Sequence, residues 1–262
     1  MDVELIKNDK KNMKFSFLMS KSTPAFANAL RRTIIDNTPV MAIEDVEFRK
    51  NSSALYDEII AHRLGLISLK TDLQTYNMIS DCTCNGEGCA KCTVKLTLKA
   101  KGEKGTYIVY ADELKSKDPK IVPVFPKTPI VKLLKNQELE LEATAILGIG
   151  RDHMKFSPGM AYYSYEPKIT VNNKSAELEK FKAKYPPQIF DKKGAIDEKK
   201  ITELNLVDAV AGVNDNIVKV EFNSENFIFT VESWGQLEAR DIVLIAAERL
   251  EKDVDKFIEK LG

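Results

Sequence analysis

The sequence predicts an α+β protein, with mainly β segments in the middle of the chain and amphipathic helices near both ends. Three observations favour this class. Several runs alternate apolar and polar residues, two segments repeat apolar residues at three- and four-residue spacing, and a lysine- and glutamate-rich segment at 168–205 lacks a clear strand pattern. With 262 residues, the chain can bury a sizeable core in one large domain or two modest ones.

The first helix is predicted by a start signal, an apolar stripe and a stop signal. Thr23 is a favourable N-cap, and Pro24 suits the first helical position, where its missing N–H costs nothing. Apolar residues then recur every four positions until Pro39 ends the pattern. This stripe consists of Phe26, Leu30 and Ile34.

Alternation predicts most of the strands: Asn12–Leu18, Val40–Phe48, "TVKLTLKA", "GTYIVYADEL" and "QELELEATAILGIG", with a turn at Lys101–Gly105 between the third and the fourth. The segment "PKIVPVFPKTPIVKL" should be extended and lie at a sheet edge, because proline cannot donate to a strand ladder. "NIVKVEFNSENFIFTVESWG" predicts a hairpin that turns around Asn223–Asn226. A short helix starting at Asp57 is expected to carry three residues inward, namely Ile59, Ile60 and Leu64.

The strongest helical pattern runs from Leu237 to Leu261. Its broad apolar face contains Val243, Ala246, Ala247, Leu250, Val254, Phe257 and Leu261. Such a helix is about 37 Å long at 1.5 Å per residue, which is more than a small core needs. This length favours burial of part of the face against another chain, although the pattern also fits a helix that covers only its own core.

All the cysteines lie in "CTCNGEGCAKC", as Cys82, Cys84, Cys89 and Cys92. Four thiolates so close in sequence, on a loop with two glycines, can surround one Zn²⁺ ion. An iron–sulfur cluster and a reduced loop without metal are the alternatives, because the spacing alone does not separate them. Four sulfur ligands leave no open position, so a zinc here would be structural.

Bulk properties limit the classes of function. Lys plus Arg and Asp plus Glu both total 39, so there is no basic excess of the kind expected of a chain that binds nucleic acid alone. No apolar run approaches the roughly 20 residues of a membrane span, and the N-terminus has no apolar signal core. We therefore expect a cytoplasmic protein with no membrane contact, in which thiols stay reduced.

The polar motifs do not assemble into an evident enzyme site. His62 lies among apolar neighbours and is expected to be structural, whereas His153 and Lys155 share the loop "GIGRDHMKFSP". These two could transfer protons in a hydrolase or transferase, but no nucleophile accompanies them, and a hydrogen-bonded loop is the favoured interpretation. Arg31 and Arg32 are expected either on an exposed helix face or in a patch that contacts a partner.

Four separated blocks occur in the order found in one family: "TPAFANALRRTIIDNTPVMAIEDVEF", "LYDEIIAHRLGLISL", "GIGRDHMKFSPGMAYY" and "FTVESWGQLEARDIVLIAAERL". Over nearly its whole length, the chain resembles the alpha-like proteins of DNA-directed RNA polymerase. This family comprises the archaeal alpha-like (D-type) protein, the N-terminal domain of bacterial alpha and the eukaryotic third-largest subunit.

The resemblance implies a discontinuous alpha-like dimerization domain (1–48 and 217–262), a mainly β insert domain (49–167, with the metal loop at 82–92) and a small extra insertion (168–216). It also implies a non-catalytic member of a nucleotidyltransferase complex, which pairs with small subunit L. With subunits N and P, this pair is the platform for the large catalytic subunits, and nucleic acid is met only in the assembled complex. The alternative is a free-standing zinc-dependent nucleic-acid-binding module.

The residues that the resemblance assigns to the partner interface are Phe26, Leu30, Arg31, Arg32, Ile34, Val243, Ala247, Leu250, Val254, Phe257 and Leu261. His153 and Lys155 would belong to a conformational loop. Many archaeal relatives carry an iron–sulfur domain where this chain has its insertion, but here there is no cysteine, and Tyr185 precedes "PPQIF" where such relatives have cysteine. A similar cysteine loop at 82–92 binds zinc in the eukaryotic relative, which favours Zn²⁺ over an iron–sulfur cluster.

Overall fold

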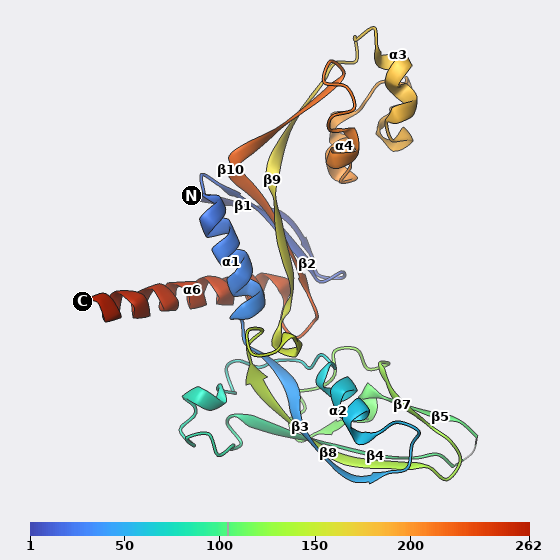
Figure 1. The fold of residues 1–262 in the computed structure, drawn as a ribbon, viewed down its shortest axis with the longest axis vertical. Helices are drawn as coiled ribbons and strands as arrows, with labels where there is room; N and C mark the ends of the chain where they lie inside the picture. The colour runs from blue at the N-terminus through green and yellow to red at the C-terminus, as the bar shows by residue number, and fades with distance from the viewer. Residues whose placement is uncertain (104) are drawn as a thin grey trace. The chain divides into compact units, whose positions relative to one another are not determined.

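The computed structural model describes residues 1–103 and 105–262 (Figure 1). The chain forms two compact units, each assembled from three stretches. The first unit comprises Met1–Leu5, Phe17–Ala27 and Tyr163–Phe229, and the second comprises Ile6–Ser16, Asn28–Tyr162 and Thr230–Gly262. Of the helices in these described ranges, none combines the length and the apolar character that crossing a bilayer requires. The α+β class predicted from the sequence is confirmed.

One four-stranded sheet has the order β1-β2-β10-β9. Its strands are β1 (Asp2–Asp9), β2 (Lys14–Ser20), β9 (Gly159–Val171) and β10 (Val218–Ser233). The sequence pattern does not predict β1. The predicted hairpin around Asn223–Asn226 is wrong, because β10 runs through it as one strand of 16 residues. None of these four residues has the positive φ that a tight hairpin turn needs, and Glu221–Glu225 are exposed, so polar side chains are tolerated within the strand.

The second four-stranded sheet has the order β3-β8-β4-β6, with β3 paired antiparallel to β8 and β8 to β4. The strands are β3 (Val40–Asn51), β8 (Glu138–Gly148), β4 (Thr93–Lys101) and β6 (Lys115–Ser116). A two-stranded sheet joins β5 (Tyr107–Tyr110) to β7 (Pro129–Leu133), and this places the proline-rich segment at an edge, as predicted. The turn predicted at Lys101–Gly105 includes Lys104, which lies outside the described residues.

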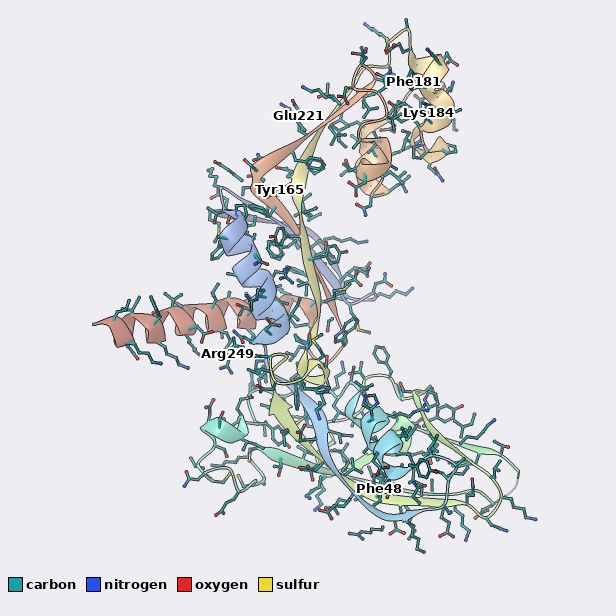
Figure 2. The ribbon with its side chains drawn as sticks, viewed as in Figure 1. Phe48, Tyr165, Phe181, Lys184, Glu221 and Arg249 are labelled. Atoms are coloured by element: carbon teal, nitrogen blue, oxygen red, sulfur yellow. The ribbon has the colours of Figure 1, made fainter. Side chains whose placement is uncertain are left out.

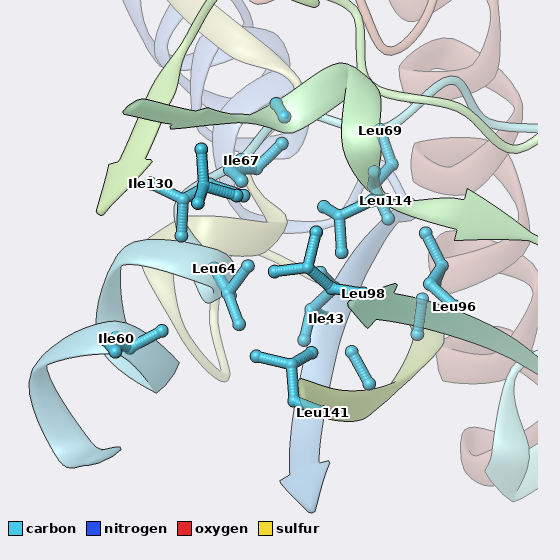
Figure 3. Close-up of a cluster of buried hydrophobic side chains, with 14 of the residues drawn as sticks. Ile43, Ile60, Leu64, Ile67, Leu69, Leu96, Leu98, Leu114, Ile130 and Leu141 are labelled. Atoms are coloured by element: carbon cyan, nitrogen blue, oxygen red, sulfur yellow. The ribbon is translucent and has the colours of Figure 1, made fainter. Parts of the chain in front are cut away.

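The core of the second sheet follows from alternation in β8, where every second residue from Leu139 to Leu147 is buried. Helix α2 (Asp57–Gly65) covers this core with Ile60 and Leu64, which are fully buried (Figure 3). Ile59 is also predicted to point inward, but it is 48% exposed. Residues four apart share one helix face, whereas adjacent residues lie about 100° apart, so Ile59 cannot join the other two.

The helix near the N-terminus, α1 (Pro24–Asp36), starts as predicted, since the Phe26 N–H donates to Thr23 Oγ1 at 3.3 Å. The helix near the C-terminus, α6, spans Ala239–Leu261. The remaining short helices are α3 (Leu178–Phe181), α4 (Glu198–Glu203), α5 (Val207–Val210) and the 3₁₀ turns η1 (Ile79–Asp81), η2 (Ala111–Glu113), η3 (Met154–Phe156), η4 (Lys182–Lys184) and η5 (Pro187–Ile189).

The segment between β9 and β10 has an apolar core of its own. Leu178, Ile189, Ile201 and Val210 are buried together with Tyr185, which is 3% exposed. The Tyr185 hydroxyl donates to the carbonyl of Asn214 at 3.4 Å. On its surface, the Lys184 ammonium lies 5.0 Å from the centre of the Phe181 ring (Figure 2). This segment is therefore held together by ordinary side-chain packing.

Candidate functional site

The four cysteines lie in one loop between η1 and β4, and their Sγ atoms are all within 4.8 Å of one another. The Cys82–Cys89 and Cys84–Cys92 pairs are 3.6 Å apart, and Cys89–Cys92 is 3.9 Å. These separations exclude disulfides, whose sulfurs lie about 2.05 Å apart. They match the edge, roughly 3.8 Å, of a tetrahedron around an ion with bonds of about 2.3 Å to sulfur.

The backbone of this loop directs N–H groups toward the sulfurs. The Cys89 N–H lies 3.2 Å from Cys92 Sγ, and the Lys91 N–H lies 3.4 Å from Cys89 Sγ. Such donors stabilise negative charge on thiolates. Gly86 and Gly88 have φ values of +91° and +83°, which side chains of L-residues disfavour, so glycine is what allows so short a loop to close around one point.

The thiols also affect one another's ionisation. Burial raises the pKa of the Cys84 thiol, but hydrogen bonds from the Cys82 thiol and the Gly88 backbone outweigh burial and lower this pKa to about 7. Burial, reinforced by the Cys84 and Cys82 sulfurs, raises the pKa of Cys92 to about 12. Adjacent thiolates repel each other, so all four ionise together only around a cation.

This donor set fits one metal ion bound in a structural role. Four sulfurs complete a tetrahedral shell and leave no position for water or a substrate. In an iron–sulfur cluster, the cysteine sulfurs are distributed over several iron atoms, and four sulfurs within 4.8 Å suit a single ion better. Cys82 and Cys92 are buried, so an ion here would fasten the loop to the start of β4.

Helix α6 has two apolar faces. Ala239, Ile242 and Ala246 are buried in the chain's own core. The other face, which we call the α6 seam, consists of Val243, Ala247, Leu250, Val254, Phe257 and Leu261. Val243 and Leu250 are half-buried, whereas Val254, Phe257 and Leu261 are 50%, 63% and 72% exposed.

The α6 seam alternates spacings of four and three residues, the pattern of a helix that packs along another helix. Every residue from Glu251 to Gly262 is exposed, so this half of the helix is not covered by the described part of its own chain. A segment of this length is marginal as an isolated helix in water. Exposed Leu244 (49%) and Ile258 (59%) add apolar area that the sequence prediction missed, although a helical projection would have placed Ile258 beside Val254, four residues earlier on the same side of the helix.

The five interface residues predicted on α1 are divided between core and surface. Leu30 and Ile34 are 6% and 0% exposed, so the chain's own core already covers them. Phe26 is 37% exposed and Arg32 is also exposed. Arg31 is half-buried, and its guanidinium donates to the side chain of Asn28 at 2.9 Å in the same helix.

The loop with His153 and Lys155 is attached to β3 by a hydrogen bond and an ion pair. The His153 imidazole Nδ1 accepts a hydrogen bond from the Lys155 N–H at 3.0 Å. The Lys155 ammonium donates to the Ile43 carbonyl at 3.0 Å and pairs with Glu44, at a bulge of β3 where the register with β8 shifts. No catalytic pair results from this arrangement. His62 is expected to be structural, but it is exposed on α2.

Comparison with known proteins agrees with this architecture. Residues 41–159 match the family described as the RNA polymerase Rpb3/RpoA insert domain. The match covers the second four-stranded sheet (β3-β8-β4-β6) and the cysteine loop, so both belong to a class of RNA polymerase domains. The chain is 40% identical to DNA-directed RNA polymerase subunit Rpo3 of Methanosarcina acetivorans, with 98% of this chain and 97% of the relative aligned.

Two further relatives carry the same name. Rpo3 of Pyrococcus horikoshii is 37% identical (94% of this chain, 93% of the relative), and Rpo3 of Archaeoglobus fulgidus is 34% identical (99% and 98%). The chain therefore belongs to the archaeal DNA-directed RNA polymerase subunit Rpo3 family.

Proposed function

We propose that this chain is a non-catalytic assembly subunit of DNA-directed RNA polymerase. The family supports work within that complex, and the observation that carries the assembly role is the exposed α6 seam. Each seam residue that becomes buried against a partner contributes roughly 1.5–3 kcal/mol for a side chain the size of Leu or Phe. Obligate interfaces are hydrophobic and resemble a protein core, and a row of apolar residues along one helix face can form part of such an interface.

The partner in this proposal is the small alpha-like subunit, designated L, with this chain as its larger, D-type counterpart. The dimerization domain comprises 1–48 and 217–262, the insert domain 49–167 and the extra insertion 168–216. Subunits N and P and the large catalytic subunits then assemble on the pair, and nucleic acid is bound by the complete enzyme in the cytoplasm. Zero net charge does not favour the alternative of a free-standing nucleic-acid-binding module.

We assign Zn²⁺ to the cysteine loop through Cys82, Cys84, Cys89 and Cys92. The sulfur separations and the closed donor set support this assignment. A bound Zn²⁺ would cross-link the loop without taking part in chemistry. In the insertion, buried Tyr185 and its apolar neighbours take the place of a cluster as the stabilising element.

Replacement of single seam residues by aspartate tests the pairing. Leu250→Asp and Phe257→Asp each place a carboxylate in the predicted interface, where burial of an unpaired charge costs several kcal/mol. We expect both variants to lose co-purification with co-expressed subunit L. Lys252→Asp is the matched control, because residue 252 is also exposed and lies on the opposite side of α6 from the seam, and it should pair normally. Full retention of L by both seam variants would show that pairing uses another surface.

A further inference from the structure

A groove of about 650 Å³ lies between the Lys70–Gln74 segment and α6. We call it the α6 groove. Its apolar surface is supplied by Leu73, Leu237, Leu244 and Ile245, and its charged rim by Lys70, Asp72, Lys120, Asp241 and Glu248. Leu244, one of the lining residues, is 49% exposed, which is a large apolar area to leave in water.

Some of the charged groups on the rim have an oppositely charged partner within the chain, and others have none. The Lys120 ammonium lies 2.9 Å from the Asp72 carboxylate, whereas the exposed Lys70 ammonium donates to the Gly235 carbonyl at 3.1 Å and has no acidic partner among the described residues. Asp241 and Glu248 are exposed and have no ion pair among the described residues. The rim therefore carries three carboxylates and two ammonium groups, and the two carboxylates on α6, Asp241 and Glu248, are unpaired within the part of the chain that the structure describes.

The geometry of these carboxylates defines what fits between them. Asp241 and Glu248 lie seven residues apart on α6, which is about 10 Å along the helix axis. Leu244 and Ile245 lie between them. Leu244 and Glu248 are rotated by roughly 100–140° from the centre of the α6 seam, so occupation of the groove does not compete with pairing along the seam.

We propose that the α6 groove binds a segment of another RNA polymerase subunit in which apolar side chains lie between two Lys or Arg residues about 10 Å apart. This inference rests on the proposed function, because the occupant is taken to be a subunit of the same enzyme. The apolar side chains cover Leu244 and Ile245, and the two cations pair with Asp241 and Glu248. Such charge complementarity selects the partner and its register more than it adds affinity.

The test uses polymerase purified from cells that express variants of this chain. A benzoylphenylalanine photo-crosslinker replaces exposed Gln74 at the rim, and the cross-linked peptide is identified by mass spectrometry. We expect a peptide from another polymerase subunit with apolar residues between two basic residues. The double variant Asp241→Lys/Glu248→Lys should reduce that cross-link about tenfold or more, because two attractions become repulsions. Retention of subunit L should not change.

A second double variant, Asp255→Lys/Glu259→Lys, reverses two exposed acids farther along α6 that do not line the groove, and it should leave the cross-link unchanged. A cross-link to a peptide without basic residues, to nucleic acid or to a second copy of this chain would overturn the proposal, as would no cross-link or no effect of the groove reversal. Failure of the chain to co-purify with any polymerase subunit would refute the proposed function instead.

Discussion

Lys155 offers a sharp test of how the loop after β8 is held. Its side chain is 13% exposed, and its ammonium donates to the Ile43 carbonyl at 3.0 Å, pairs with Glu44 and lies 5.1 Å from the centre of the Phe156 ring. Lys155→Met keeps the length of the side chain and removes its charge and its donors. The variant isolates the polar contacts from the packing of the stem.

The expected cost follows from these contacts. A charged hydrogen bond to the carbonyl contributes about 1.5–3 kcal/mol, and the ring contact about 0.5–1 kcal/mol. The pair with Glu44 adds little, because that carboxylate is 42% exposed and screened by water. Methionine avoids the desolvation cost of a buried ammonium, which offsets part of the loss. We expect a net loss of about 1–3 kcal/mol in the free energy of opening this region.

Amide hydrogen exchange, measured by mass spectrometry on peptides covering 40–51 and 149–160, gives this local free energy. Glu44→Gln is the matched control, because it removes the carboxylate but leaves the bond from Lys155 to Ile43, and it should cost less than about 1 kcal/mol. Unchanged exchange in Lys155→Met, or equal effects of the two variants, would refute the view that the carbonyl bond holds the loop at the bulge.

Three further predictions concern the metal loop, the insertion and an acid-sensitive turn. Elemental analysis should find about one zinc per chain, and Cys89→Ser should lose it; iron with visible absorbance, or no metal, would contradict the assignment. Ile189→Ala should destabilise the insertion by about 2–5 kcal/mol, because the residue is fully buried, and rapid proteolysis between 172 and 217 would reveal it; undiminished protease resistance would argue against the apolar core. Hydrogen bonds from the Lys120 and Thr75 side chains lower the pKa of Asp72 to about 2, so its contribution to stability is complete above about pH 5 and is lost as the pH falls toward 2. The difference in urea midpoint between wild type and Asp72→Asn should therefore become smaller as the pH falls toward 2. A midpoint difference that does not change with pH would show that ionised Asp72 does not stabilise this turn.

Local patterns in the sequence are sufficient for features built from neighbouring residues. The four cysteines meet because eleven consecutive residues with two glycines can close on one point, and Thr23 caps α1 because the partner N–H is three residues away. The α6 seam is also visible in the sequence, since a helix of this length repeats its spacing regardless of its surroundings. These features depend on contacts between residues that lie close together in the sequence.

Features that join distant residues require the folded chain. Leu30 and Phe257 belong to similar apolar stripes, yet one is 6% exposed and the other 63%, because burial depends on which elements of the fold pack against each stripe. The polar run in β10 has the composition of a turn, and only pairing with neighbouring strands shows that it continues as a strand whose faces both meet water there. Lys155 reaches a carbonyl 112 residues away, and Gln74 and Leu244 meet at one groove. Sequence periodicity reports one element at a time, whereas such contacts depend on how elements pack.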